Sequence, residues 1–426
     1  MKRGLFLIIV LLGGLGIVLA ILFLILRNPY SQINPPPETP PVPTTVTAPP
    51  PTAEEAETTE ILTARVGDTL GATVGIDGAR LVFFDQKDNK IKVTEFDGTG
   101  EQELSDSLAG VTAMGVAPTK DRAWLQLDDP ETDDLISLIY DFRVREAVRL
   151  ENGIQALDWS PDGQQLVYYV EREGIAPQLR TTSYAGLEPR TIRDNFVLID
   201  PVLRWYAPEA MAYWLKPDGA RPSGVVTLKT NGSQAIELIT PLAAQQVIFS
   251  PDGELFLATN NSPTTDKPEV FVGSVADKLV SPVPLTTWAD KCTWTADSSR
   301  VLCFVPQDLP AGFVWPDDDA GLTYRDQLWS IDAQTGEPQR LYDVPASIPD
   351  ATQPFISKNN TRLTFFDKAR NALVSLDISG LLSAPAAPEE GASTLPTGPG
   401  PGSGTGNFTF PFGNSGNTGN TGNTGY

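Results

Sequence analysis

One pattern in the sequence recurs at intervals of mostly 42 to 47 residues and constrains the fold more than any other feature. In each copy, a short apolar segment leads into a tight turn with Asp, Asn or Gly, and a strongly apolar segment follows. Two copies are clear, at residues 157–170 and 247–258. Five looser copies share this layout, with turns at Asp77, Lys120, Glu209, Asp297 and Asn359. Turns of this composition join antiparallel strands, because proline presets φ and glycine accepts a positive φ.

A repeat of about 40–45 residues is typical of a four-stranded β-propeller blade. The seven turns predict an all-β fold, a β-propeller of about seven four-stranded blades over residues 60–382. The last interval, of 62 residues, leaves six or eight blades open. The final repeat lacks a fourth strand after residues 372–377, and the segment Ile61–Val66 precedes the first repeat. We expect this segment to complete the last blade, which closes the ring and removes an exposed sheet edge.

The two clear turns read Ser160-Pro161-Asp162-Gly163 and Ser250-Pro251-Asp252-Gly253. They resemble the turns of TolB-type, WD40-like (PD40) propeller repeats, and similar blades occur in prolyl-oligopeptidase-type peptidases. The resemblance implies a propeller over about residues 60–382 and implies no activity. The peptidases need a serine nucleophile and a histidine in a separate domain, whereas this chain has no histidine.

The N-terminal segment carries no charge from Leu5 to Leu26, a run of 22 residues. At about 1.5 Å per residue, such a helix crosses the hydrocarbon core of a bilayer. Lys2 and Arg3 precede it, so the positive-inside rule places residues 1–4 in the cytoplasm, a transmembrane helix at 5–27 and the propeller outside. A cleaved signal peptide is the alternative, although its apolar region is usually shorter. The sequence therefore predicts a single-pass membrane protein with an extracytoplasmic propeller.

Two low-complexity segments flank the propeller. Residues 28–59 are rich in proline, which favours an extended spacer, and we interpret them as a stalk. Residues 383–426 are rich in Gly, Asn and Thr, a composition that predicts disorder. Within this tail, Phe408, Phe410 and Phe412 are candidate contacts for a partner protein.

Composition excludes several functions. The formal net charge is -22, and an acidic surface repels phosphate backbones, so we expect no nucleic-acid partner. The lack of histidine excludes Ser-His-Asp and Cys-His catalysis and the common zinc sites. No phosphate-binding or cofactor motif is present, and no cofactor is expected. A pair of carboxylates remains possible as general acid and base.

Three groups of residues are candidate sites. Pairing that sets Trp294 opposite Val301 also sets Cys292 opposite Cys303, so a cross-strand disulfide and two buried free thiols are both open. An insertion at residues 307–325 contains Asp317, Asp318 and Asp319, which suit Ca²⁺ or form a solvated acidic loop. The same insertion contains Trp315 and Tyr324, which are candidate partner contacts or core residues.

The architecture and the lack of catalytic motifs lead us to expect a non-enzymatic scaffold that binds a protein of the cell envelope. A module that binds a glycan or a small molecule in the central channel is the alternative, and a carboxylate-based hydrolase or lyase is a third interpretation.

Overall fold

The computed structural model describes residues 59–75, 78–129, 135–278, 280–348 and 350–382. The expected transmembrane segment 5–27, the stalk, the tail and its three phenylalanines lie outside these residues. Within them, no helix is long and apolar enough to cross a membrane.

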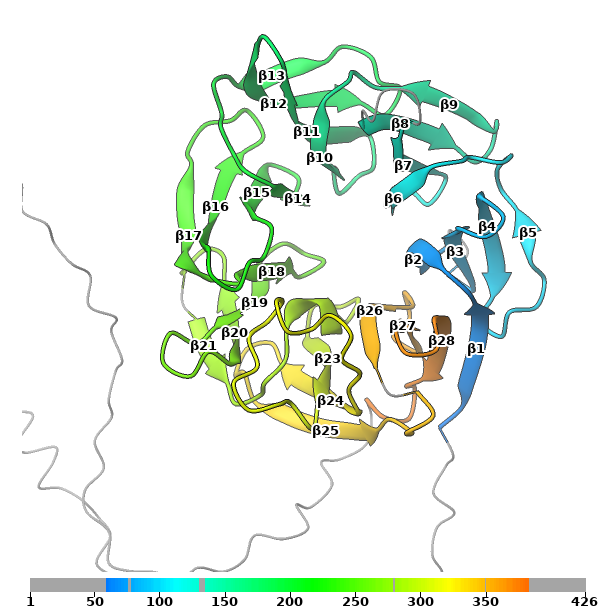
Figure 1. Ribbon diagram of the computed structural model, residues 1–426, viewed down its shortest axis with the longest axis vertical. Helices are drawn as coiled ribbons and strands as arrows, with labels where there is room; N and C mark the ends of the chain where they lie inside the picture. Colours follow the sequence, from blue (N-terminus) through cyan, green and yellow to red (C-terminus); the bar gives the residue numbers. More distant parts are fainter. Residues whose placement is uncertain (1–58, 76–77, 130–134, 279, 349, 383–426) are drawn as a thin grey trace, which may run out of the picture. The chain divides into compact units, whose positions relative to one another are not determined.

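The described residues form a ring of seven four-stranded antiparallel sheets (Figure 1). We number the blades along the chain. Blade 1 consists of β2 (Thr69–Val74), β3 (Arg80–Asp85), β4 (Lys90–Glu95) and β5 (Gln102–Glu103), and blade 2 consists of β6 (Val111–Val116), β7 (Arg122–Asp128), β8 (Leu135–Asp141) and β9 (Glu146–Arg149). Blade 3 consists of β10 (Ile154–Trp159), β11 (Gln165–Arg172), β12 (Ile175–Ser183) and β13 (Arg190–Arg193), and blade 4 consists of β14 (Pro201–Ala207), β15 (Ala210–Leu215), β16 (Pro222–Lys229) and β17 (Ile236–Ala243).

The remaining blades have the same order, with one short helix before blade 6. Blade 5 consists of β18 (Gln246–Phe249), β19 (Leu255–Asn261), β20 (Pro268–Ser274) and β21 (Val280–Val283). The 3₁₀ helix η1 (Ala289–Lys291) precedes blade 6, which consists of β22 (Cys292–Trp294), β23 (Arg300–Pro306), β24 (Asp326–Asp332) and β25 (Pro338–Asp343). Blade 7 consists of β26 (Ala351–Ile356), β27 (Arg362–Asp367), β28 (Ala372–Asp377) and β1 (Ile61–Val66). The predicted propeller with seven blades is thereby confirmed.

The ring closes through β1, which pairs antiparallel with β28, for example Ile61 with Leu376. The N-terminal strand is therefore the outer strand of the last blade, as the sequence predicted (Figure 1). This pairing leaves β28 covered on both sides, so the ring presents no long unpaired strand at its seam.

The cores lie between neighbouring blades. One cluster joins Val82 and Phe84 of blade 1 to Ala123 and Leu125 of blade 2, and similar clusters occupy the other junctions. The second strand of each blade faces a neighbour on both sides, and β3 is therefore apolar throughout Leu81–Phe84.

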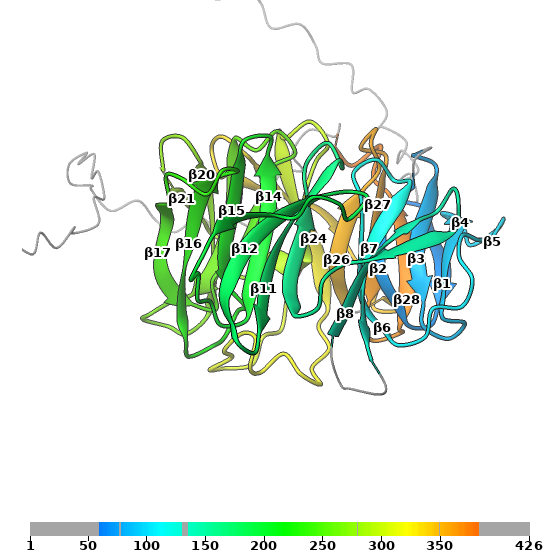
Figure 2. The same ribbon diagram turned by 90° about the horizontal axis from the view of Figure 1, so that it is seen from above.

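The strands run through the thickness of the disc, and their connections gather at its two faces (Figure 2). At one face, the first strand of each blade turns into the second, and the third strand turns into the fourth. The insertion 307–325 joins β23 to β24, a second and a third strand, and therefore belongs to the opposite face.

Candidate inter-blade site

The turns between first and second strands share one backbone geometry in six blades. The amide of the fourth turn residue donates to the carbonyl of the first, as in Gly163 to Ser160 (2.8 Å) and Lys120 to Ala117 (2.8 Å). The fourth residue has a positive φ in each case: Gly78, Lys120, Gly163, Gly253, Ser298 and Asn360. Glycine and asparagine adopt this left-handed conformation readily, whereas a long side chain is unfavourable there. Lys120 is the one charged residue among these six.

The side chain of Lys120 spans the junction between two blades. It starts from the turn of blade 2, and its Nζ donates to Oγ1 of Thr73 on β2 of blade 1 (3.0 Å). Burial disfavours the ammonium form and lowers the pKa of Lys120 to about 8. The neutral amine, which is the form that accepts a proton, is therefore populated much closer to neutral pH than in an ordinary lysine.

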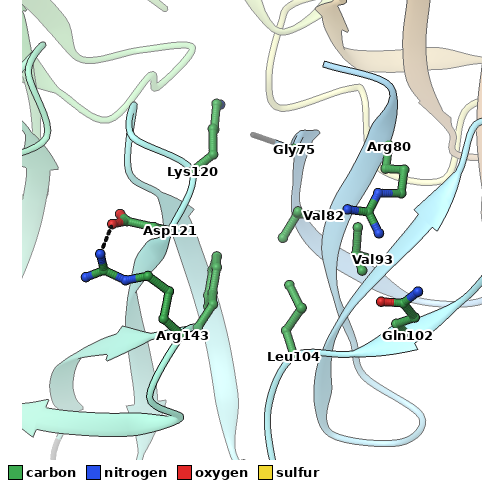
Figure 3. Close-up of a pocket in the computed structure, with 10 residues that line it drawn as sticks. Gly75, Arg80, Val82, Val93, Gln102, Leu104, Lys120, Asp121 and Arg143 are labelled. Atoms are coloured by element: carbon green, nitrogen blue, oxygen red, sulfur yellow. Dashed lines mark ion pairs between the residues drawn. The ribbon is translucent and has the colours of Figure 1, made fainter. Parts of the chain in front are cut away.

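A crevice of about 250 Å³ opens beside Lys120. Figure 3 shows its two walls. Blade 1 contributes one wall, and blade 2 contributes the other. The lining residues of these walls are Gly75, Arg80, Val82, Val93, Gln102 and Leu104 from blade 1, and Lys120, Asp121, Phe142 and Arg143 from blade 2. Three cationic side chains and one carboxylate thus surround an apolar floor.

Asp121 orders the cationic wall. Its Oδ2 lies 2.9 Å from Nη2 of Arg122 and 3.4 Å from Nη1 of Arg143. The hydrogen bond from Arg122 is the main reason that the pKa of Asp121 falls to about 2. The carboxylate therefore stays ionised and positions guanidinium groups. Arg143 also donates two hydrogen bonds to Asp141, from Nε (3.3 Å) and from Nη2 (2.8 Å), while its side chain is 62% exposed.

The crevice combines the groups needed to hold an organic anion and to remove a proton from it. Guanidinium groups bind carboxylates through paired hydrogen bonds. An amine with a pKa near the working pH is suited to general base catalysis. In the sequence, Lys120 stands out only as the turn residue of a loose copy of the repeat. The signal that marks it is a lysine at the turn position where the clear repeats carry glycine.

The two cysteines form a disulfide. Cys292 on β22 faces Cys303 on β23, with Cα atoms 4.1 Å apart, in the register that sets Trp294 opposite Val301. Both residues are buried in the core between blades 5 and 6. The bond ties the inner strand of blade 6 to its neighbour and lies away from the crevice residues.

The carboxylates of the three aspartates of the insertion do not converge on one point, which is the arrangement of an acidic loop. Asp317 Oδ1 accepts from the amide of Gly219 (3.4 Å), Asp318 Oδ2 accepts from that of Val314 (2.8 Å), and Asp319 pairs with Lys368 (2.9 Å). Each carboxylate thus contacts a different residue. Within the described ranges, no group of three or more His, Cys, Asp or Glu side chains is suited to a metal ion.

The two aromatic residues of the insertion are core residues, which is one of the two roles that the sequence left open for them. Trp315 and Tyr324 are only 5% and 3% exposed. They pack with Trp288 and Phe313 in a cluster of their own. This cluster fixes the insertion on the propeller, so the two rings are not accessible to a partner.

A buried ion cluster lies beside these rings. Nζ of Lys291 contacts Asp326 (2.9 Å), Asp350 (2.8 Å) and the carbonyl of Ala351 (2.8 Å). The three charged side chains are at most 1% exposed. No substrate reaches them in this conformation, so the cluster joins blades 6 and 7 and is not a candidate active site.

Comparisons with known proteins identify the fold. No protein-family model and no curated protein sequence matches the chain. Among solved structures, an oligogalacturonate lyase in complex with manganese matches with a TM-score of 0.55 and 13% identity, covering 74% of this chain and 90% of that chain. An oligogalacturonate lyase from Vibrio parahaemolyticus matches with a TM-score of 0.53 and 12% identity, covering 76% and 92%. The tricorn protease matches with a TM-score of 0.50 and 12% identity, covering 78% of this chain and 35% of that one.

These similarities correct the expectation of a non-enzymatic scaffold. That expectation depended on the architecture and on the lack of familiar catalytic motifs. Proteins named as lyases share the architecture, so a propeller of this kind is no argument against an enzyme. The resemblance to TolB-type repeats extends no further than the propeller fold, since no family model supports it.

The residues that the structure describes do not fit a manganese site. Manganese prefers several oxygen or imidazole ligands around one point. The chain contains no histidine, and the described Asp and Glu side chains form no group of three that is suited to a metal. We therefore derive no chemical step through a metal ion.

Proposed function

We propose that the protein binds an acidic oligosaccharide, one that contains uronate units, in the crevice between blades 1 and 2 and cleaves it as a lyase. The observation that carries this proposal is the amine of Lys120, which has a pKa lowered to about 8 and lines a crevice with two arginines. A volume of about 250 Å³ is close to the small end of ligand pockets, which favours one sugar unit at a time.

In the proposed reaction, Arg80 and Arg143 hold the carboxylate of the uronate. The neutral amine of Lys120 donates one hydrogen bond to Thr73 and keeps its lone pair for the proton on the carbon next to the carboxylate. The electron pair of that C–H bond becomes the new C=C bond of the ring. The adjacent bond between carbon and glycosidic oxygen breaks, the oxygen keeps its electron pair, and water protonates it.

The charges of the crevice suit this reaction. Removal of the proton develops negative charge on the carboxylate, and nearby guanidinium groups stabilise that charge. Asp121 remains ionised because its pKa is about 2, so it cannot protonate the leaving oxygen. Its role is to position Arg122 and Arg143.

The test uses the full-length chain with oligogalacturonate, oligomannuronate and oligoglucuronate as probes. Lyase activity produces a conjugated double bond that absorbs ultraviolet light. We expect turnover of at least one probe, with kcat/KM rising with pH around a midpoint near 8, because only neutral Lys120 accepts the proton.

Lys120→Gln should lower kcat at least about 100-fold, the effect typical of a lost general base. Lys358→Gln is the matched control, since Lys358 lies exposed in the corresponding turn of blade 7. Binding of a uronate without turnover would contradict the lyase assignment. The lack of both binding and turnover for all three probes would contradict the whole proposal.

A further inference from the structure

A second inter-blade cavity lies between blades 3 and 4 and is larger, about 660 Å³. It lies two blades further along the ring than the first crevice and in the same place relative to its two blades. In blade 1, Val93 pairs with Val82 and Gln102. In blade 3, Thr181 pairs in the same way with Val167 and Arg190. The two cavities therefore have equivalent walls, and their residues can be compared position by position.

This comparison shows a change of charge. Arg80 begins β3, and Gln165 begins β11. Asp141 pairs with Arg122, the first residue of β7, and Arg143 follows Asp141 by two residues. In blade 4, Lys229 pairs with Ala210, the first residue of β15, and Asn231 follows Lys229 by two residues. Asn231 is therefore the equivalent of Arg143. Two cations of the first crevice thus become neutral amides in the second.

The third cation is also lost. Lys120 lies two residues before β7, and Pro208 lies two residues before β15. The charged residues that line the second cavity, Glu188 and Arg190, have opposite signs. The lining of the second cavity thus contains one charged residue of each sign, whereas that of the first contains three basic residues and one acidic residue.

The lining of the second cavity is that of a site for hydroxyl groups. Hydroxyl-bearing residues Thr181, Thr182, Ser183 and Thr191 contribute to one wall. The hydroxyls of Thr182 and Ser183 donate to the carbonyl of Leu187, and that of Thr191 donates to Gln178, so these three hydroxyls offer a ligand their acceptor oxygens. Oδ1 of Asn231 already accepts from the amide of Ser233 (3.0 Å), so its Nδ2 is the group available to a ligand. Two aromatic side chains, Tyr184 and Trp205, complete the lining. Aromatic rings provide a flat apolar face, and amides and hydroxyls exchange hydrogen bonds with a polyol.

One polar atom in this wall lacks a partner. Trp205 is 6% exposed, and its Nε1 has no hydrogen-bond acceptor in the protein. The indoles of Trp159 and Trp294 instead donate to carbonyls of the preceding blade, at 2.8 and 3.1 Å. A buried N–H without an acceptor is unfavourable, and a ligand oxygen that reached it through a small shift of the surrounding side chains would satisfy it.

We propose that the cavity between blades 3 and 4 is a second binding site, which takes an uncharged sugar unit. It differs from the proposed lyase site in place and in ligand charge, and it does not depend on that proposal. A chain with both sites recognises a polysaccharide in which neutral and acidic sugars occur together.

The experiment titrates the full-length chain, by calorimetry, with neutral oligosaccharides of glucose, galactose, mannose and xylose. At least one should bind. Trp205→Phe keeps an aromatic ring and removes the N–H, so the affinity should fall about fivefold, the effect of one hydrogen bond. Asn231→Leu removes the amide and should weaken binding to a similar extent.

Trp294→Phe is the matched control, because it removes an indole N–H whose acceptor is a backbone carbonyl in another blade. It should leave the affinity for the neutral sugar unchanged. Trp205→Phe should also leave uronate turnover unchanged, which separates this inference from the proposed lyase activity. If none of the four sugars binds, or if both site variants bind as tightly as the parent chain, the second site is refuted.

Discussion

At Lys120, both the backbone and the side chain are in an unfavourable state. The backbone has φ of 60°, a conformation that costs an ordinary residue about 1 kcal/mol. The corresponding turns of blades 3 and 5 avoid this cost with glycine. The side chain loses hydration as well, which is the cause of its lowered pKa. Ser298 and Asn360 accept a positive φ at the same position of blades 6 and 7, but of these three residues only Lys120 has a long side chain.

The strain at Lys120 can be measured by comparing two variants. Lys120→Asn and Lys120→Gln both remove the amine and its bond to Thr73, but only asparagine suits a positive φ, as Asn360 shows in blade 7. We expect Lys120→Asn to unfold at higher urea concentration than Lys120→Gln, with about 0.5–1 kcal/mol more free energy of unfolding. Both variants should lack activity. Equal stability of the two variants would argue against backbone strain at this position.

At the scale of elements, the insertion 307–325 shows how neighbouring segments change the role of a residue. Its aspartates lie close in sequence, yet their carboxylates bind Gly219, Val314 and Lys368. Its aromatic rings pack on Trp288 next to η1. Beneath this cluster, Lys291 of η1 contacts Asp326 of β24 and Asp350 just before β26. The insertion and the ion cluster together hold blades 6 and 7.

Removal of the buried ammonium should destabilise this junction strongly. Lys291→Met leaves two buried carboxylates without a cation, and we expect the free energy of unfolding at pH 7 to fall by about 3–5 kcal/mol. Burial already raises the pKa of Asp326 to about 6, above its unfolded value, so Asp326 makes the parent chain lose stability as pH rises from about 4 to about 6.

The loss caused by Lys291→Met should therefore shrink at pH 5, below the pKa of about 6 of Asp326, where this carboxylate takes up a proton. Urea unfolding at both pH values measures this difference. Lys216→Met is the control, because Lys216 is exposed. A loss below about 1 kcal/mol at pH 7 would show that the cluster is not an important contact between the blades.

At the scale of the whole molecule, a single strand closes the ring. β1 pairs with β28 and places Ala64 in a cluster with Leu81, Phe83 and Leu373. Arg65 forms an ion pair with Asp85 of blade 1, so the strand contacts both sides of the seam. The ends of a propeller are otherwise joined only by contacts between blades, and the closing strand adds a covalent continuity to the seam.

A chain that starts at residue 67 should lose this closure, whereas one that starts at residue 59 should keep it. The shorter chain exposes the edge of β28 and the apolar residues under β1. We expect its melting temperature to fall by roughly 5–10 °C, the effect of about 3 kcal/mol in a domain of this size, and we expect it to associate through the free edge. Calorimetry and light scattering measure both effects. Identical melting of the two chains would contradict a closing role for β1.

The sequence by itself determined the propeller, a number of blades close to seven and the closing strand, because these depend on a repeated turn and on apolar strand segments that are local in the chain. It also determined the register of Cys292 and Cys303, since one turn connects their strands. Only the tertiary structure decided the sites. Arg80 and Arg143 are 63 residues apart and meet because two blades lie side by side. The burial that lowers the pKa of Lys120 depends on that same contact, and so does the unpaired indole of Trp205 between blades 3 and 4.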